Sequence, residues 1–269
     1  MAMKKTICYL LTSILLLFPA ASQAVSGETL EIWGSTTCQK RFLEPGARAV
    51  EKATGITIKV NGSGTGQGLL ALIEGKIEVS AASEDLKDTV KLARNLSQQY
   101  SPTLSIPKNL MFHKIMDDEI VPIVHKSNTV KALSWKQLKD IHTGNIRNWQ
   151  EVGGPDLPIT IVTSHEGSAT RSFFSRKVLD NAPFSSNTIR VDSTAKEILE
   201  VSIKRGAIGV VSMAFLMITP MDTRILKTEK IVRPLGLITI GAPSGKAKKV
   251  IDYLQSEEGQ KSISKMSMP

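Results

Sequence analysis

The order of structural elements is set by the stretch Thr29–Ala82, TLEIWGSTTCQKRFLEPGARAVEKATGITIKVNGSGTGQGLLALIEGKIEVSAA. Three short segments have the apolar pattern of strands, and two longer segments carry the apolar residues of helices. The expected strands are 29–33, 56–60 and 77–82, and the expected helices are 40–53, kinked at its Pro-Gly pair, and the segment through 69–73. Strands that alternate with helices in this way pair in parallel through right-handed crossovers. The stretch therefore predicts an α/β fold.

The remainder of the chain continues the same alternation. Further strands are expected at 120–125, 159–163, 207–212 and 231–240, and helices at 134–142, through 173–179 and around 250–254. A chain of 269 residues is long enough for one large domain or two lobes.

The composition is that of a soluble globular protein, with 41% hydrophobic and 22% charged residues. Because there is ample apolar material for a core, wholesale disorder is excluded. The 34 Lys and Arg residues exceed the 25 Asp and Glu residues, which gives a net charge of +9 and makes anions the first candidate ligands. The basic residues are scattered and only 5% of residues are aromatic, so we expect no nucleic-acid partner.

The first residues have the pattern of a secretory leader. Lys4 and Lys5 precede an apolar run from Ile7 to Ala21, and Ser22-Gln23-Ala24 offers the small residues of a cleavage site. The run is short for a membrane-spanning helix. We therefore expect residues 1–24 to be a signal peptide and the mature protein to be periplasmic.

Three turns between a strand and a helix combine Gly with Ser or Thr, and they carry the chemistry. They are Gly34-Ser35-Thr36-Thr37, Gly62-Ser63-Gly64-Thr65-Gly66 and Gly167-Ser168-Ala169-Thr170. A helix start offers unpaired N–H groups and a partial positive charge, Gly admits an anion to the backbone, and hydroxyls add donors. Each turn alone is better explained as an ordinary helix cap. Three together predict an anion site built from neutral groups.

Other chemistries find less support. The Gly62 turn lacks the register of a dinucleotide fingerprint, and no Gly-Lys-Ser or Gly-Lys-Thr sequence forms a P-loop. Ser168 is not in a G-x-S-x-G nucleophile elbow, which argues against a serine hydrolase, so we expect no enzyme activity. The four His residues are dispersed, and Cys38 is the only cysteine after the leader. We expect no metal, no cofactor and no internal disulfide, with Cys38 buried.

The stretch Leu133–Phe174, LSWKQLKDIHTGNIRNWQEVGGPDLPITIVTSHEGSATRSFF, resembles the periplasmic phosphate-binding proteins of ABC transporters. The segment DIHTGNIRNW, followed by VGGPD, a strand and a Gly-Ser turn, matches the pattern of that family. Further matches are GSTT at Gly34, NGSGTG at Asn61, GAIGVV at Gly206, RPL at Arg233 and SEEGQ at Ser256. The resemblance covers nearly all of the chain after the leader.

The resemblance implies a two-lobed type II periplasmic-binding fold that closes around its ligand. Each lobe is expected to hold a mainly parallel sheet flanked by helices, with hinge crossovers near 114–120 and 231–237. The first lobe would comprise 25–115 and 236–269, and the second lobe 116–235. The implied function is to capture a tetrahedral oxyanion, with inorganic phosphate as the first candidate, and to deliver it to an ABC permease in the inner membrane. The protein is expected to be a monomer. The alternative is an anion-responsive sensor or scaffold without a transport role.

The resemblance also implies a set of ligand-binding residues. From the first lobe these are Ser35, Thr36, Thr37, Ser63 and Ser83, and from the second lobe Ser168, Ala169 (through its backbone N–H), Thr170 and Arg171. Many family members carry Asp where this sequence has Ser83 and Arg where it has Ser164. Without that Arg a charge-assisted bidentate contact is missing, and His165 or Arg171 is the candidate to replace it. Without that Asp we expect weaker discrimination against sulfate.

Overall fold

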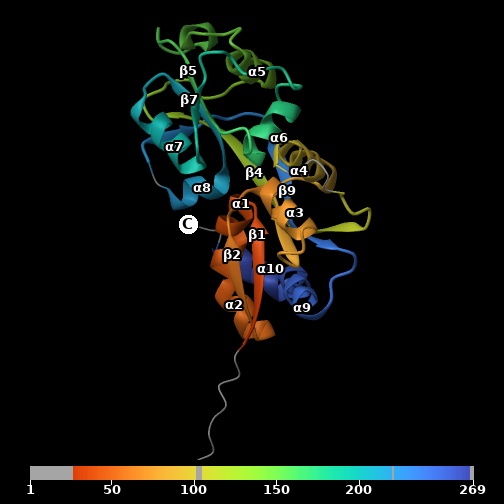
Figure 1. The fold of residues 1–269 in the computed structure, drawn as a ribbon. Helices are drawn as coiled ribbons and strands as arrows, with labels where there is room; N and C mark the ends of the chain where they lie inside the picture. The colour runs from red at the N-terminus through yellow and green to blue at the C-terminus, as the bar shows by residue number, and fades with distance from the viewer. Residues whose placement is uncertain (1–26, 101–104, 220, 267–269) are drawn as a thin grey trace, which may run out of the picture.

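One sheet runs through the molecule in a computed structural model that describes residues 27–100, 105–219 and 221–266 (Figure 1). The expected leader, residues 1–24, lies outside the described residues. The strand order is β2-β1-β3-β9-β4-β7-β5-β6, and β8 pairs with β4 off this path. The strands are β1 (Glu28–Gly34), β2 (Ile56–Asn61), β3 (Val79–Ala82), β4 (Leu110–His125), β5 (Thr160–Ser164), β6 (Ile189–Val191), β7 (Ala207–Ser212), β8 (Thr223–Ile225) and β9 (Ile231–Ile240).

Helices flank this sheet along its whole length. They are α1 (Thr36–Cys38), the π-helical segment η1 (Gln39–Leu43), α2 (Glu44–Thr54), α3 (Thr65–Ile73), α4 (Leu86–Tyr100), α5 (Trp135–Thr143), the 3-10 segment η2 (Trp149–Val152), α6 (Ala169–Lys177), α7 (Thr194–Ile203), α8 (Met213–Ile218), α9 (Gly245–Gln255) and α10 (Glu257–Met266). Within the part of the chain that the structure describes, no helix is both long and apolar enough to cross a bilayer.

The two longest strands connect the halves of the molecule. β4 and β9 pair antiparallel from Leu110 opposite Ile240 to Ile120 opposite Ile231, with an irregularity between Lys114 and Met116. Figure 1 shows both strands passing through the middle of the molecule, between the two groups of helices. The expected strand at 120–125 is the end of β4. Charged residues along 114–119 interrupt the apolar pattern, which explains why the first part of this strand was not predicted.

Four apolar clusters define two lobes on either side of this strand pair. Two clusters belong to the first lobe, formed by β1–β3, α1–α4, α9 and α10, and include Leu30 and Leu72. The other two belong to the second lobe, formed by β5–β8 and α5–α8, and include Trp149 and Val211. The two-lobed α/β architecture expected from the sequence is therefore confirmed, and the exact boundaries of 25–115, 116–235 and 236–269 stay a prediction.

Several local predictions are confirmed. β1 pairs in parallel with β2 and β3, and Ser134 caps α5 as expected. The helix expected over 40–53 instead begins at Thr36 and passes through η1 before α2. Four helices, α4, α7, α8 and α10, were not among the predicted elements.

A buried carboxyl fastens α7 to the sheet of the second lobe. Glu197 is only 2% exposed, and its Oε1 accepts a hydrogen bond from the backbone N–H of Val210 in β7 at 2.9 Å. Burial raises the pKa of Glu197 to about 8, although the backbone N–H groups of Val210 and Ser164 oppose the shift. The folded protein therefore keeps a proton on this group at pH 7, where the unfolded chain releases it.

Glu197 gives the protein a pH-dependent stability. Because its pKa is raised on folding, its contribution is fully present below about pH 4.5 and is lost as pH rises through about 8. We expect Glu197 to lower the free energy of unfolding by about 1 kcal/mol per pH unit between pH 6.5 and pH 8, measured by urea denaturation. Below about pH 6.5, His142 has the opposite effect, because burial lowers its pKa to about 4. Glu197→Gln should flatten the slope above this pH. Some slope remains from Glu84, whose pKa burial raises to about 7.

The matched control is Glu200→Gln, which changes a partly exposed carboxylate on the same helix. This variant should keep the slope of the original protein. A slope between pH 6.5 and pH 8 that Glu197→Gln leaves intact would contradict the assignment.

Candidate functional site

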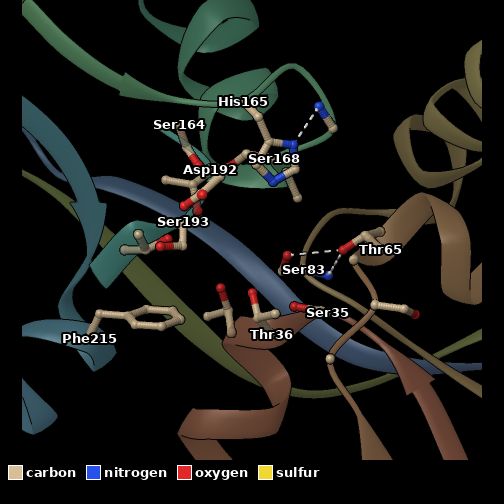
Figure 2. Close-up of a pocket in the computed structure, with 18 of the residues that line it drawn as sticks. Ser35, Thr36, Thr65, Ser83, Ser164, His165, Ser168, Asp192, Ser193 and Phe215 are labelled. Carbon is tan, nitrogen blue, oxygen red and sulfur yellow. Dashed lines mark hydrogen bonds between the residues drawn. The ribbon is translucent and has the colours of Figure 1, made fainter. Parts of the chain in front are cut away.

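A cavity of about 320 Å³ lies between the two lobes (Figure 2). The first lobe lines it with 35–37, 62–65 and 83, and the second lobe with 164, 165, 167–170, 192–195 and 215. The volume is at the lower end of the range of small-molecule sites. Of the nine residues expected at the ligand, eight line this cavity: Ser35, Thr36, Thr37, Ser63, Ser83, Ser168, Ala169 and Thr170. The structure thus brings the three predicted turns together, while their role in binding stays a prediction.

Helix N-termini converge on the cavity from both lobes. α1 and α3 begin at the first and second predicted turns, and α6 begins at the third. The cavity is also lined by the start of α7, where Ser193 is the N-cap and Thr194 the first helical residue. The sequence analysis missed this fourth turn. N–H groups and partial positive charge at four helix starts favour a negatively charged ligand without any charged side chain.

Two glycines allow the first turn to lie where it does. Gly34 has a φ of +138°, and a Cβ added there would lie 2.2 Å from the carbonyl oxygen of Ala81. A Cβ at Gly68 in α3 would lie 2.4 Å from the Cα of Gly34. The end of β1 is therefore pressed between β3 and α3, which places Ser35 and the helix start behind it at the cavity.

The hydroxyls of the cavity keep their hydrogens available. Oγ of Ser35 accepts a hydrogen bond from the N–H of Cys38 at 3.1 Å, and Oγ of Ser168 accepts one from the N–H of Arg171 at 3.4 Å. Both hydroxyls therefore act as helix caps, which is the alternative role that the sequence left open for these turns. A capping hydroxyl uses a lone pair, so its O–H is still free to donate into the cavity. Oγ of Ser63 is buried and has no hydrogen-bond partner.

Ser83 lies at the same cavity and is only 1% exposed. Its Oγ is 3.3 Å from Oγ1 of Thr65, and its backbone N–H donates to that same oxygen at 3.4 Å (Figure 2). The sequence analysis did not single out Thr65 within the second turn. If one of these two hydroxyls donates its hydrogen to the other, the hydrogen of the second hydroxyl is free to bind a ligand.

The charge at the cavity is unusual for a candidate anion site. Among the described residues that line it, none is Lys or Arg, and Asp192 is the one carboxylate. A hydrogen bond from Lys196 lowers the pKa of Asp192, which is therefore ionised at neutral pH. His165 also lines the cavity, and its Nδ1 accepts a hydrogen bond from the N–H of Gly167 at 3.1 Å. Only Nε2 of this ring is left to donate.

Arg171 does not lie where a ligand contact was expected. It does not line this cavity, and its guanidinium lies over the ring of Phe184, with 4.6 Å between Cζ and the ring centroid. The reason is the helical turn: a residue that directly follows Thr170 on α6 is rotated by about 100° away from it. Arg171 lines a separate cavity between α4 and α6 instead.

A buried ion pair at the strand crossing supports both halves of the cavity. Nε of Arg233 in β9 donates to Oδ2 of Asp118 in β4 at 3.0 Å, and Nη2 donates to Oγ1 of Thr37 at 3.1 Å. Oδ1 of Asp118 accepts a hydrogen bond from Oγ of Ser212, the N-cap of α8, at 2.7 Å. Thr37 and the α8 residue Phe215 both line the cavity. The sequence analysis noted Arg233 only as part of a family motif.

The expectations about Cys38 can be examined in the same region. Its side chain is fully buried, and its Sγ donates to the carbonyl oxygen of Ala82 at 3.2 Å. Burial raises the pKa of Cys38 to about 12. Cys38 is therefore a small buried residue under α1, as expected, and not a reactive thiol.

Comparison with known proteins supports the resemblance noted in the sequence. A family model described as the PBP superfamily domain matches residues 19–258. The phosphate-binding protein PstS of Bacillus subtilis (strain 168) is 28% identical over 257 residues, which cover 91% of this chain and 81% of that protein.

Solved structures agree. A substrate-binding protein of Clostridium perfringens with bound phosphate has a TM-score of 0.74 and 28% identity, covering 89% of this chain and 98% of that one. An ABC-type phosphate transport receptor of Vibrio cholerae, at 21% identity and a TM-score of 0.66, shares the fold over 88% of this chain and 98% of its own. The chain therefore belongs to the PBP superfamily, and within it resembles the phosphate-binding proteins of ABC transporters.

Proposed function

We propose that this protein captures a tetrahedral oxyanion, with inorganic phosphate as the first candidate, and delivers it to an ABC permease. The observation that carries the proposal is the cavity between the lobes, where helix starts and hydroxyls converge and where Oγ of Ser63 is buried without a partner. A buried hydroxyl without a partner is costly unless a ligand accepts its hydrogen bond. The names of the Bacillus and Clostridium relatives support phosphate as that ligand.

The proposed contacts come from both lobes. Thr36 and Ser63 hold the anion from the first lobe, with Ser35 and Thr37 as neighbours that shape the turn. Ser168 and Thr170 donate from the second lobe, and Ala169 donates through its backbone N–H. Because the ligand contacts both lobes, it favours the arrangement in which they face each other, and a permease can recognise that arrangement.

Transport is the role we propose, and a sensor or scaffold of the same fold is the alternative. The two roles differ in the partner that recognises the closed protein. Uptake of labelled phosphate by a strain that lacks this gene distinguishes them, because only the transport role predicts reduced uptake. Catalysis is not part of the proposal. Oγ of Ser168 caps α6, and Nδ1 of His165 is occupied by the N–H of Gly167.

We propose that the protein acts in the periplasm after loss of residues 1–24. The support is the leader pattern in the sequence, together with the relationship to transporter binding components. The intact mass of the protein from a periplasmic extract tests this cleavage site. A mass that retains the leader would contradict it.

Removing one donor should weaken phosphate binding. Ser63→Ala and Thr170→Val each delete a hydroxyl from the cavity, and a hydrogen bond to a charged acceptor contributes about 1.5–3 kcal/mol. We expect each variant to lose about tenfold or more in affinity by calorimetric titration with phosphate. Arg171→Ala, outside the cavity lining, should cost less affinity than either variant. A Ser63→Ala or Thr170→Val protein that binds phosphate as tightly as the original would refute the assigned contacts.

Ser83 should set the selectivity between phosphate and sulfate. A carboxylate only accepts hydrogen bonds, so a buried Asp favours an anion that still carries a proton and repels sulfate. Ser83 has a hydroxyl that both donates and accepts. Asp192 can replace such a buried Asp only weakly. Its side chain is 68% exposed and paired with Lys196, so water and the ammonium group screen its charge. We therefore expect weak discrimination against sulfate in the protein as it stands.

The test is Ser83→Asp, titrated with phosphate and with sulfate at one ionic strength. The substitution should lower the affinity for sulfate more than that for phosphate. Asp192→Asn is the matched comparison and should change the ratio of the two affinities less. If Ser83→Asp and the original protein have the same phosphate-to-sulfate ratio, Ser83 does not contact the ligand.

A further inference from the structure

Beside the cavity, an ion pair joins the two lobes directly. Nη2 of Arg176 in α6 donates to Oε2 of Glu84 at 3.0 Å and to Oδ2 of Asp88 at 2.8 Å. Arg176 belongs to the second lobe, whereas Glu84 follows β3 and Asp88 lies in α4 of the first lobe. Figure 1 shows α4 and α6 next to each other across the division between the lobes. Most ion pairs of the described residues join exposed groups, but the Arg176 side chain is only 19% exposed.

Glu84 depends on this arginine. Its side chain is fully buried, and its Oε1 has no hydrogen-bond partner. Burial raises the pKa of Glu84 to about 7, and the largest opposing influence is the charge of Arg176, followed by that of Arg233. Asp88 acts in the other direction, because it adds a second negative charge beside Glu84. A buried carboxylate with one bonded oxygen is costly once its cation is removed.

Both ends of the ion pair are connected to the candidate site. Glu84 directly follows Ser83, which lines the cavity. Arg176 lies on the helix that begins with the cavity residues Ala169 and Thr170, and its Nη1 is held to that helix by Oγ of Ser172 at 2.8 Å. The guanidinium of Arg176 is thus fixed on the second lobe and binds carboxylates of the first lobe.

We propose that Arg176 is a positioning residue for anion capture, which holds the two halves of the cavity against each other through Glu84 and Asp88. The proposal rests on the function proposed above, because it assigns a role within the same site. Arg176 does not touch the ligand in this assignment. It acts by favouring the arrangement of the lobes in which donors from both sides reach one anion.

The expected consequence is a change in the fraction of binding-competent protein. Without Arg176, the closed arrangement buries the Glu84 carboxylate with no cation from the second lobe, whereas opening returns it to water. The equilibrium therefore shifts toward the open arrangement. The apparent affinity for phosphate falls in proportion to the closed fraction that is lost. Glu84→Gln removes the buried charge, so it should relieve much of the effect of losing Arg176.

The experiment compares phosphate affinity in the mature protein with that in Arg176→Gln, Glu84→Gln and the double variant. We expect Arg176→Gln to weaken binding by at least about fivefold, a typical size for coupling between a conformational equilibrium and a ligand. The double variant should bind more tightly than Arg176→Gln alone. Binding by Arg176→Gln equal to the original, or a double variant no better than Arg176→Gln, would overturn the proposal.

Small-angle scattering without ligand supplies a second measurement that does not depend on phosphate. Arg176→Gln should have a larger radius of gyration than the original, and circular dichroism confirms that it is folded. The matched control is Lys139→Gln, which breaks the ion pair with Asp180 inside the second lobe and should leave the radius unchanged. An unchanged radius in Arg176→Gln overturns the proposal. If the original protein does not bind phosphate, the proposed function fails, and the scattering comparison still decides the role of Arg176.

Discussion

The buried ion pair between Arg233 and Asp118 is the interaction on which the geometry of the candidate site depends. It joins β4 and β9 where they cross between the lobes, and its remaining hydrogen bonds reach Thr37 in one lobe and Ser212 in the other. Breaking a buried pair by removing one partner typically costs about 3–5 kcal/mol, because a charge is left without compensation. The two strands are therefore tied to residues of both lobes at this point.

The described residues that line the cavity offer an anion mainly neutral donors. Helix starts and hydroxyls are donors whose direction is fixed by the fold, so they need little reorganisation when a charge arrives. A lysine or arginine in the cavity would be charged also in the empty protein, and would have to be desolvated or paired there. The cations lie elsewhere: Arg233 is paired at the crossing and Arg176 between α4 and α6. Lys and Arg still outnumber Asp and Glu in the chain after the proposed leader, and this net positive charge attracts anions from solution.

The sequence was sufficient for features that depend on neighbouring residues. The three turns could be predicted because each follows an apolar strand and begins a helix within a few residues. The turn at Asp192–Ala195 escaped notice because β6 has only three residues, too few to show an alternation. Arg171 was assigned to the ligand by its place in a motif, but the helix turns it onto Phe184. The pair Arg176–Glu84 joins positions far apart in the chain, and no local pattern indicates such a contact.

The first part of the family-like stretch, residues 140–149, does not line the cavity but holds two of the strands that lead to it. In the segment DIHTGNIRNW, the indole N–H of the fully buried Trp149 donates to the carbonyl oxygen of Gly206 at 2.9 Å. The same carbonyl accepts the N–H of Thr160 at 3.0 Å, so the motif fastens the starts of β5 and β7 together. At their other ends these two strands carry Ser164, which lines the cavity, and Ser212, which binds Asp118. The strands are thus fastened at one end by residues outside the cavity lining, while Ser164 at the other end of β5 lies in that lining.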